Sequence, residues 1–460
     1  MKKNLLALAV AGAFAAPAAA LAQSSFVQIY GTLNADLEAA KADGGAPLLN
    51  PTLFAPTYGV TGGLPGVNGV IIRPTGVNSQ AAAVRADAFV QIPNQAGLSS
   101  NSSNIGFRGS EDLGGGLKGI FQIESLINLD TGGGNLGGRN SNVGLASNWG
   151  TAFYGQWDTP YKFITLKADP FFATSAPSFN SVIGAPGFNV LSTTVNSPTL
   201  TGASLTTLAQ DAAFDRRQGN SVQYWSPDFA GFSGRLMYSA GERTQNYALS
   251  GVTTGTTRAG QLNPWMWGAS LQYDNGPIYA AASYEQHQDY FGTRVMTGTT
   301  TLGSSSKDWG GKVVIGAQNL WGFSLYGVFE RLSYSTDGLE FTNTANSGLV
   351  RDWKRNAYGF MGTYGFGNFT LRAGWMTAND ASCTSVGPQI CNADGTGTNQ
   401  YSIGGSYNFS KRTLAYLFYT LQDNGDISRY RMGTNTGPVQ SNVPVGGQAQ
   451  AYGLGIRHTF

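Results

Sequence analysis

His287 is the residue whose type and neighbours most resemble a catalytic base. Glu285 and Asp289 lie two positions away on either side, so in a strand all three side chains would share one face. Acid–base catalysis needs such groups to converge in a closed site. This segment instead runs directly into a polar loop. We therefore expect His287 to be a solvated residue beside a loop, and we do not expect the chain to be an enzyme.

The two cysteines, Cys383 and Cys391, lie eight residues apart in a segment rich in Gly, Asn, Asp and Thr. In an oxidising compartment this spacing favours a local disulfide that pins one loop. Neither of the two histidines lies nearby, so we expect no metal site. The glycine runs at 114–116 and 132–134 lack the helix and lysine that a phosphate cradle needs, and we expect no cofactor.

Single basic residues recur on the polar side of segments in which apolar and polar residues alternate. Arg108 follows the apolar Phe107, and Arg217 is in phase with the polar Ser221. The same alternation places further basic candidates on the polar side, namely Arg235, Lys312, Arg355, Arg372 and Arg457. Charges around an aqueous passage select ions through their field. That chemistry requires a framework that turns every polar side inward.

The first residues are typical of an export signal. Lys2 and Lys3 precede an apolar stretch over 5–16, and Ala20-Leu21-Ala22 is a small-x-small cleavage site. The apolar stretch is too short to anchor the chain in a bilayer. We predict that 1–22 is a secretory signal peptide and that 23–460 is the mature protein. Because removal of the leader cancels the formal charge of +2, the charge balance gives no indication of nucleic-acid binding.

The composition is poor in charge and rich in glycine. Charged residues make up 12% of the chain, where about a quarter is usual for soluble domains. Of the 460 residues 64 are glycine, a residue that suits crowded barrel walls and tight turns. Aromatic residues, at 12%, suit membrane interfaces. This composition argues against both a disordered chain and an ordinary cytoplasmic enzyme.

Alternating segments follow one another through short turns and long polar loops in strict succession. The expected strands are at about 26–38, 100–110, 117–129, 139–147, 151–158, 217–226, 231–239, 265–273, 278–290, 309–318, 323–334, 353–364, 369–377, 401–409, 413–422 and 448–460. Lengths near ten residues suit tilted membrane crossings, and lipid excludes open sheet edges. We predict an all-β fold: one closed antiparallel transmembrane β-barrel of about 16 strands. A soluble β-core with half-buried strands is the alternative.

The last ten residues show the two faces that such a strand needs. Tyr452, Leu454, Ile456 and Phe460 point one way, and Arg457 points the other. In a membrane barrel the apolar face contacts lipid and the other face lines the lumen.

Four stretches are specific enough to compare with a known family. They are 103–124 (SNIGFRGSEDLGGGLKGIFQIE), 139–145 (RNSNVGL), 220–227 (NSVQYWSP) and a C-terminal region with Lys411-Arg412-Thr413 and Phe460. Together they resemble the general porins of Gram-negative bacteria, especially those of beta-proteobacteria. The resemblance extends over the mature chain and implies a 16-stranded barrel in the outer membrane, in contact with lipid and lipopolysaccharide. It also implies a homotrimer and passive diffusion of ions and small hydrophilic solutes.

The resemblance gives several positions an expected role. The third long loop of the family folds into the pore and narrows it, which corresponds to 161–215 here. Arg108 and Arg217 occupy positions where the family has basic residues facing that loop. The family's terminal phenylalanine is read by the barrel-assembly machinery, so Phe460 would be an assembly signal.

The same comparison exposes departures. Gln156 stands where the family commonly has a basic residue, and Arg139 is out of lumen phase, which suggests a bulge or a subunit contact. The acids of the expected constriction are few and could equally be loop caps or solvated carboxylates: Asp169, Asp211 and Asp215, with Asp158 at its root. With more inward bases than acids, we expect a slight preference for anions.

Two further expectations stay open at the level of the sequence. Phe153 and Trp157 are candidates for the trimer contact or for lipid contact. The aromatic residues of the expected constriction are Phe163, Phe171, Phe172, Phe179 and Phe188. They would line a path for one solute in a substrate-specific channel, or else pack the loop against the wall.

Overall fold

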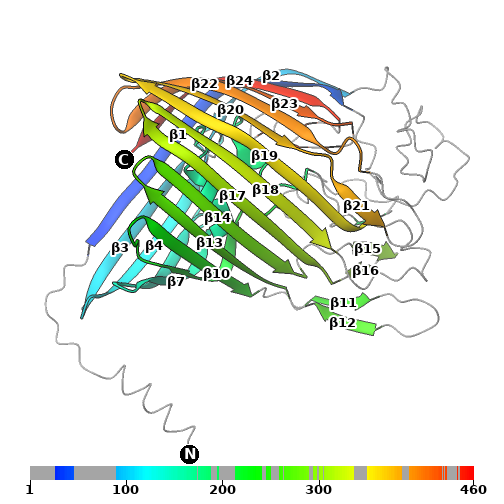
Figure 1. The fold of residues 1–460 in the computed structure, drawn as a ribbon, viewed down its shortest axis with the longest axis horizontal. Coiled ribbons are helices and arrows are strands. Elements are labelled where there is room, and N and C mark those ends of the chain that lie inside the picture. Colours follow the sequence, from blue (N-terminus) through cyan, green and yellow to red (C-terminus); the bar gives the residue numbers. More distant parts are fainter. Residues whose placement is uncertain are drawn as a thin grey trace, which may run out of the picture.

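Sixteen antiparallel strands close into one ring in the computed structural model (Figure 1). The ring strands are β1 (Phe26–Gly45), β3 (Asn104–Gly114), β4 (Leu117–Ile127), β6 (Ser141–Ser147), β7 (Gly150–Asp158), β9 (Arg217–Trp225), β10 (Phe232–Ala240), β13 (Trp265–Asn275), β14 (Ile278–Gln288), β17 (Lys307–Leu320), β18 (Phe323–Ser335), β19 (Val350–Phe366), β20 (Phe369–Ala378), β22 (Thr398–Asn408), β23 (Thr413–Asn424) and β24 (Gln448–Thr459). Each expected strand is present at its predicted place, and the predicted barrel is confirmed.

The structure describes residues 26–45, 90–172, 175–187, 194–195, 213–240, 245–249, 258–262, 264–289, 294–297, 300–303, 305–335, 350–385, 393–426, 428, 430–432, 443 and 446–460. The predicted leader at 1–22 therefore lies outside the described residues. Among the residues described, no helix is long and apolar enough to cross a membrane.

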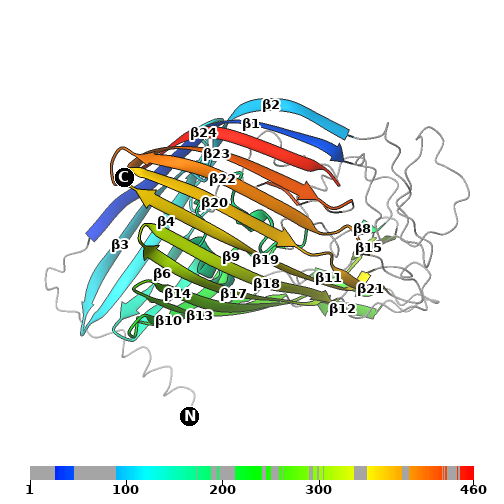
Figure 2. The same cartoon turned by 45° about the horizontal axis from the view of Figure 1, so that its top comes forward.

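The first and last strands form the seam of the barrel. β24 pairs with β1 from Thr32↔Thr459 to Asp43↔Gln448, and the two strands run side by side in Figure 2. The last residue completes the seam, because Gly31 N–H donates to Phe460 O at 3.2 Å and Phe460 N–H donates to Gly31 O at 3.1 Å. A Cβ on Gly31 would lie 2.6 Å from the Phe460 ring, so only glycine admits the terminal ring there.

The first strand is longer than the alternation predicted. It runs to Gly45, and its second edge is covered first by β3 and then by β2 (Val90–Ser100). Between β2 and β3 the extended backbone is interrupted at Ser102, whose φ is 55°. The Ser103 hydroxyl accepts a hydrogen bond from Asn34 N–H and donates one to Asn34 O. The expected strands at 26–38 and 100–110 left 39–99 as a connection, but both ends of that stretch are paired strand.

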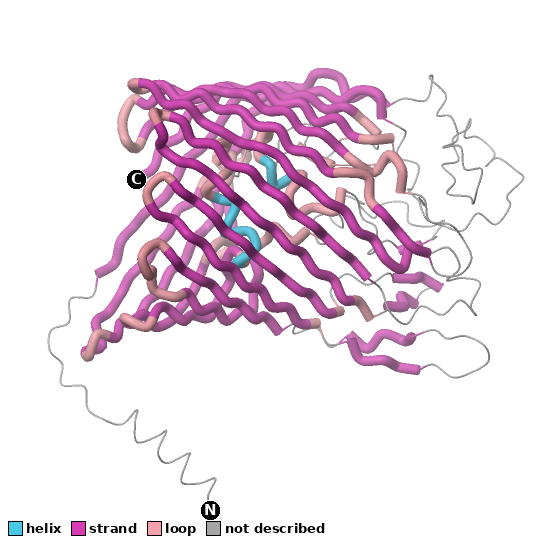
Figure 3. Tube along the Cα trace, in the orientation of Figure 1, coloured by secondary structure: helices cyan, strands magenta, loops and turns pink. Residues whose placement is uncertain are grey.

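Short turns and long connections segregate to opposite ends of the barrel. The short turns lie at the end that also holds the C-terminus (Figures 1 and 3). The other end carries small additions: the hairpin β11 (Gln245–Leu249) and β12 (Arg258–Leu262), and a sheet of β8 (Thr194–Val195), β15 (Arg294–Thr297) and β16 (Thr300–Gly303). β5 (Gly134–Asn135) extends the edge of the ring at β4, and β21 (Ser382–Ser385) at β19.

The outer face of the wall is apolar along every strand. On β24 the large apolar side chains are exposed, with Leu454 at 62%, while the alternate positions turn inward. Large apolar side chains on β20 and β22 are likewise exposed: Phe369, Leu371, Tyr401, Ile403 and Tyr407. The inward positions carry polar side chains such as Gln223 and Gln422, both buried. This distribution matches a wall with lipid outside and water inside.

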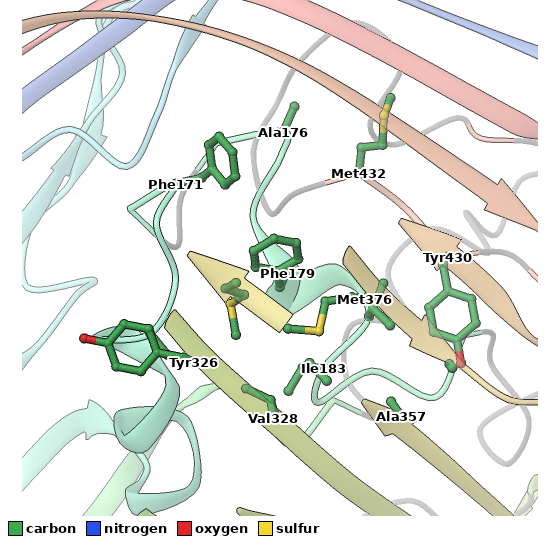
Figure 4. Packing of buried hydrophobic residues seen from close by; sticks show 14 of the residues in the cluster. Phe171, Ala176, Phe179, Ile183, Tyr326, Val328, Ala357, Met376, Tyr430 and Met432 are labelled. Carbon is green, nitrogen blue, oxygen red and sulfur yellow. The ribbon is translucent and has the colours of Figure 1, made fainter. Parts of the chain in front are cut away.

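A folded segment after β7 packs against the inner wall. It begins with α2 (Pro160–Leu166), where Thr159 caps the helix by accepting from Lys162 N–H and Pro160 occupies the first turn. A short 3₁₀ helix, η2 (Phe179–Ser181), follows. Its apolar residues and those of the wall form a buried cluster inside the barrel (Figure 4), which includes Phe171, Ala176, Phe179, Ile183, Tyr326, Val328, Met361 and Met376. The segment therefore fills one side of the lumen.

Glycine in the wall makes room for this packing. A Cβ on Gly374 of β20 would lie 2.1 Å from Cζ of the buried Phe179 ring. We predict that Gly374→Ala displaces the ring and lowers the free energy of unfolding by about 1–3 kcal/mol, the usual cost of overpacking a core. Thermal unfolding in detergent measures it. Gly405→Ala is the matched control, since its Cβ would meet nothing closer than 3.7 Å. Equal effects of both changes would contradict the account.

Candidate pore constriction

Buried charges on the inner wall hold the segment that follows β7. Glu330 on β18, which is 0% exposed, accepts from Tyr161 Oη at 2.5 Å and from Gly184 N–H at 2.8 Å. Arg355 on β19 pairs with Glu330 at 2.9 Å and donates to Val182 O at 2.7 Å. Since breaking a buried pair leaves an uncompensated charge, this group fixes the segment firmly to the wall.

A second anchor lies one strand away. Lys312 on β17 is fully covered, and its Nζ donates to Thr165 Oγ1 at 3.0 Å and lies 3.4 Å from Asp215 Oδ1. Burial raises the pKa of Asp215 to about 6, against the opposing pull of the Lys312 ammonium. Asp215 thus closes the far end of the segment onto the wall and does not project into the water path.

His287 belongs to the same buried layer. Its ring stacks on Phe214 at 4.3 Å, and Nε2 lies 2.8 Å from Glu285 Oε1. The side chain is 0% exposed, so the expectation of a solvated histidine beside a loop is wrong. The reason is that the segment ending at Phe214 folds back over β14 and covers it. No solvent-accessible acid–base group results.

Asp158 and Arg217 come together at the root of the segment. They face each other in register between β7 and β9, with Arg217 Nε 3.4 Å from Asp158 Oδ1. Lys162 lies 3.0 Å from the same carboxylate, and Asn140 donates to it at 2.7 Å. Arg217 also donates to Asn140 Oδ1 at 2.9 Å. This cluster sets two cations, Arg217 and Lys162, against the single carboxylate of Asp158.

Gln156 and Asp169 hold backbone in place. Gln156 Nε2 donates to Gly138 O at 2.8 Å and to Arg139 O at 3.3 Å. Asp169 accepts from Phe171 N–H at 2.8 Å, Ser178 Oγ at 2.7 Å and Phe179 N–H at 3.3 Å. The structure thus places Asp169 as a loop cap, one of the two roles the sequence left open. Asp211 lies outside the described residues.

Four inward arginines form no ion pair with any described residue. The guanidinium of Arg235 lies 3.1 Å from the ring centroid of Phe163 on α2 and 3.9 Å from that of Trp225. Arg372 and Arg457 both contact the ring of Phe172. Arg108 is exposed and donates to Gln28 Oε1 at 2.9 Å near the short-turn end. These positions carry positive charge toward the lumen.

The sequence reasoning missed one inward ion pair. Arg139 Nε lies 2.5 Å from Glu124 Oε1, and Tyr30 Oη donates to Oε2 of the same carboxylate at 3.0 Å. Arg139 precedes the first residue of β6, so strand alternation does not govern where it points. The inward phase of Glu124 opposite Gly106 was the available signal. The expectation of a subunit contact for Arg139 is wrong.

Phe153 and Trp157 also point inward. Phe153 is buried, and its ring lies 5.0 Å from Trp225 and 5.3 Å from Trp157. Trp225 in turn stacks with Arg235 inside the barrel. The register shift between Gly155 and Trp157 adds a residue on β9, so the alternation of β7 itself is unbroken and keeps Phe153 and Trp157 on the same face. The expected trimer or lipid contact of these two residues is therefore wrong.

The remaining predicted positions lie at the periphery. Cys383 on β21 is disulfide-bonded, and Cys391 lies outside the described residues. Phe460 is exposed at the short-turn end, as described for the seam. No group of three or more His, Cys, Asp or Glu side chains suited to a metal ion occurs within the described ranges.

A closed barrel with an apolar outer wall, a polar inner wall and a segment folded across the lumen defines a membrane channel. The comparisons specify it further. The family model described as "Gram-negative porin" matches residues 7–427, so the chain belongs to the Gram-negative porin family. It is an outer-membrane protein for the passive diffusion of ions and small hydrophilic solutes, and it is not an enzyme.

Individual relatives are distant but cover most of the chain. Outer membrane porin protein 32 of Delftia acidovorans is 26% identical, over 84% of this chain and 92% of the relative. Major outer membrane protein P.IB of Neisseria meningitidis serogroup A is 24% identical over the same shares. Among solved structures, the anion-selective porin from Comamonas acidovorans matches with a TM-score of 0.60 and 20% identity, covering 95% of this chain and all of that one. The trimer form of OmpT of Vibrio cholerae matches at 0.53 with 13% identity, covering 95% and 99%.

The buried anchor generates a prediction. Glu330→Gln removes the negative charge that faces Arg355. It also replaces one of the two carboxylate oxygens that accept hydrogen bonds from Tyr161 and Gly184. We expect the free energy of unfolding to fall by about 3–5 kcal/mol, because the buried guanidinium of Arg355 is left without its charged partner. The released segment should give noisy, fluctuating single-channel currents in planar bilayers. Glu111→Gln is the control, since Glu111 is exposed next to a short turn. A quiet Glu330→Gln channel with unchanged thermal unfolding would contradict the assignment of Glu330 as an anchor.

Proposed function

We propose that this channel is a general diffusion pore with a modest preference for anions, and that the segment 161–215 is its constriction. The observation that carries the proposal is the imbalance of charge on the inner wall. Arg108, Arg235, Arg372 and Arg457 are at least partly exposed and lack an ion pair among the described residues. The inward acids Asp36, Glu38, Glu124, Asp158, Glu285, Asp308 and Glu330 are buried, and the partly exposed Asp274 forms an ion pair with Lys167.

The physical consequence follows from the low dielectric of the wall. The acids are covered, and Glu124, Asp158 and Glu330 are also paired with a base. The partly exposed arginines have no such partner and raise the local concentration of anions. The matched porin from Comamonas acidovorans is titled anion-selective, which agrees with this proposal. Gln156 contributes no charge to this wall, and its amide donates to two backbone carbonyls.

A substrate-specific channel is the second candidate, and the packing of the described aromatic residues favours the general pore over it. Phe171 and Phe179 are buried in the cluster between segment and wall. Phe163 and Phe172 are stacked on arginines. Phe188 lies outside the described residues. The four described rings thus support packing of the constriction and not a continuous aromatic path for a solute.

Assembly and export complete the proposal. Cleavage after Ala22 would release the mature chain to the outer membrane, where Phe460 would present the seam strand to the barrel-assembly machinery. The exposed apolar wall would contact lipid and lipopolysaccharide, and three copies would assemble as a homotrimer. The trimer form of the similar Vibrio cholerae protein supports the last point.

The selectivity is tested by the zero-current potential across a KCl gradient. We expect a sign that reports chloride in excess of potassium, and Arg108→Glu should move it toward cations by replacing a positive with a negative charge on the inner wall. Lys411→Glu is the matched control, since it makes the same charge change on the exposed β22–β23 turn. Cation selectivity of the unmodified channel would refute the proposal, and an identical shift in both variants would remove Arg108 from the permeation path.

A further inference from the structure

Two inward arginines from different strands meet at one ring of the constriction segment. The guanidinium carbons of Arg372 on β20 and Arg457 on β24 each lie 4.7 Å from the ring centroid of Phe172. They are therefore no farther apart than twice that distance. The ring of Tyr416 closes the group from β23, at a centroid distance of 6.0 Å. Two cations and two aromatic rings thus converge at Phe172.

The donors of the two guanidinium groups are only partly used. Arg372 donates to Pro170 O at 2.8 Å and to Ser406 Oγ at 2.9 Å, while its buried Nε has no hydrogen-bond partner. For Arg457 no hydrogen bond or ion pair occurs with the described residues. The nearest acid along the segment is Asp169, whose carboxylate already accepts three hydrogen bonds from the segment itself. Asp169 attracts Arg372 electrostatically without forming an ion pair with it, so this one carboxylate stands against two guanidinium groups.

The backbone that presents the ring is also unusual. Phe172 has φ of 67°, a left-handed conformation that bulky residues rarely adopt. Such conformations persist where the surroundings determine them strongly, and they cluster at binding sites. Here the contacts with Arg372 and Arg457 hold the ring at the water path.

We propose that Arg372 and Arg457, with Phe172 and Ser406, form a binding station for an oxyanion group of a solute in transit. Planar guanidinium groups match the geometry of carboxylates and phosphates, which accept two parallel hydrogen bonds, and a halide lacks that geometry. An oxyanion would satisfy the unused donors and relieve the repulsion of the two cations. This inference rests on the proposed anion-permeable pore and names the solute class that it would retain.

The station is tested by adding a solute to single channels in KCl. Inorganic phosphate serves as the probe for phosphate groups, and succinate serves as the probe for carboxylate groups. We expect either or both to lower the chloride current saturably. Arg457→Gln should raise the half-blocking concentration about tenfold, the loss of one charge-assisted hydrogen bond. Since Arg457 forms no such bond within the described structure, this variant should fold normally, and Arg372→Gln should act in the same direction.

Arg412→Gln is the matched control, because it removes one arginine charge from the exposed turn at the same end of the barrel. A shift confined to the two inward variants supports the station, and the probe that blocks identifies its solute. Equal shifts in all three variants, or a current that falls without saturation, would overturn it. The zero-current potential in KCl, recorded on the same channels, shows separately whether the underlying anion preference holds.

Discussion

Closure of the sheet is the constraint on which the rest of this structure depends. In hydrocarbon each unsatisfied backbone N–H or C=O costs several kcal/mol, so a sheet that spans a membrane can have no free edge. β1 and β24 close the sheet by pairing along 12 residue pairs, which leaves neither strand with a free edge there. The last residue, Phe460, is itself hydrogen-bonded to Gly31. Closure fixes the alternation of every wall strand relative to the lumen. It also fixes which charges can face one another across the water.

Within that ring, burial divides the inner-wall charges into two sets. Glu330, Arg355 and Lys312 are covered by the segment after β7 and act as its anchors. Removing charges from water is costly, and each of these groups recovers the cost through several bonds to the segment. The arginines that the segment leaves partly exposed keep their charge for the water path. In the proposed pore, the path of the segment after β7 therefore sets the electrostatic field, because the segment covers some wall charges and leaves others partly exposed.

Much of this arrangement could be predicted from the sequence. The period-two alternation and the succession of short and long connections identified sixteen strands, the outward face and the inward phase of Arg235, Arg372 and Arg457. Alternation fails where the backbone leaves regular pairing. The position of Arg139 before its strand is a local example, and it led to a wrong orientation.

Burial by a distant segment is the second thing that alternation does not encode. His287 and Glu285 look solvated in sequence because a polar loop follows them, yet Phe214, more than seventy residues earlier, lies on the histidine ring. The same holds for Asp215, which reads as a pore acid and is instead paired with Lys312 beneath the segment. A charged wall residue that is covered by the segment anchors it, and one that is left uncovered faces the lumen. The path of the segment is needed to tell these two cases apart.

The central claim is that the anchored segment narrows the barrel and leaves a water path beside it. Single-channel conductance of the folded protein in planar bilayers, measured over a range of KCl concentrations, tests this claim most directly. The account predicts a stable open conductance that rises linearly with salt. Folded protein that carries no current would contradict it, because the segment would then plug the barrel.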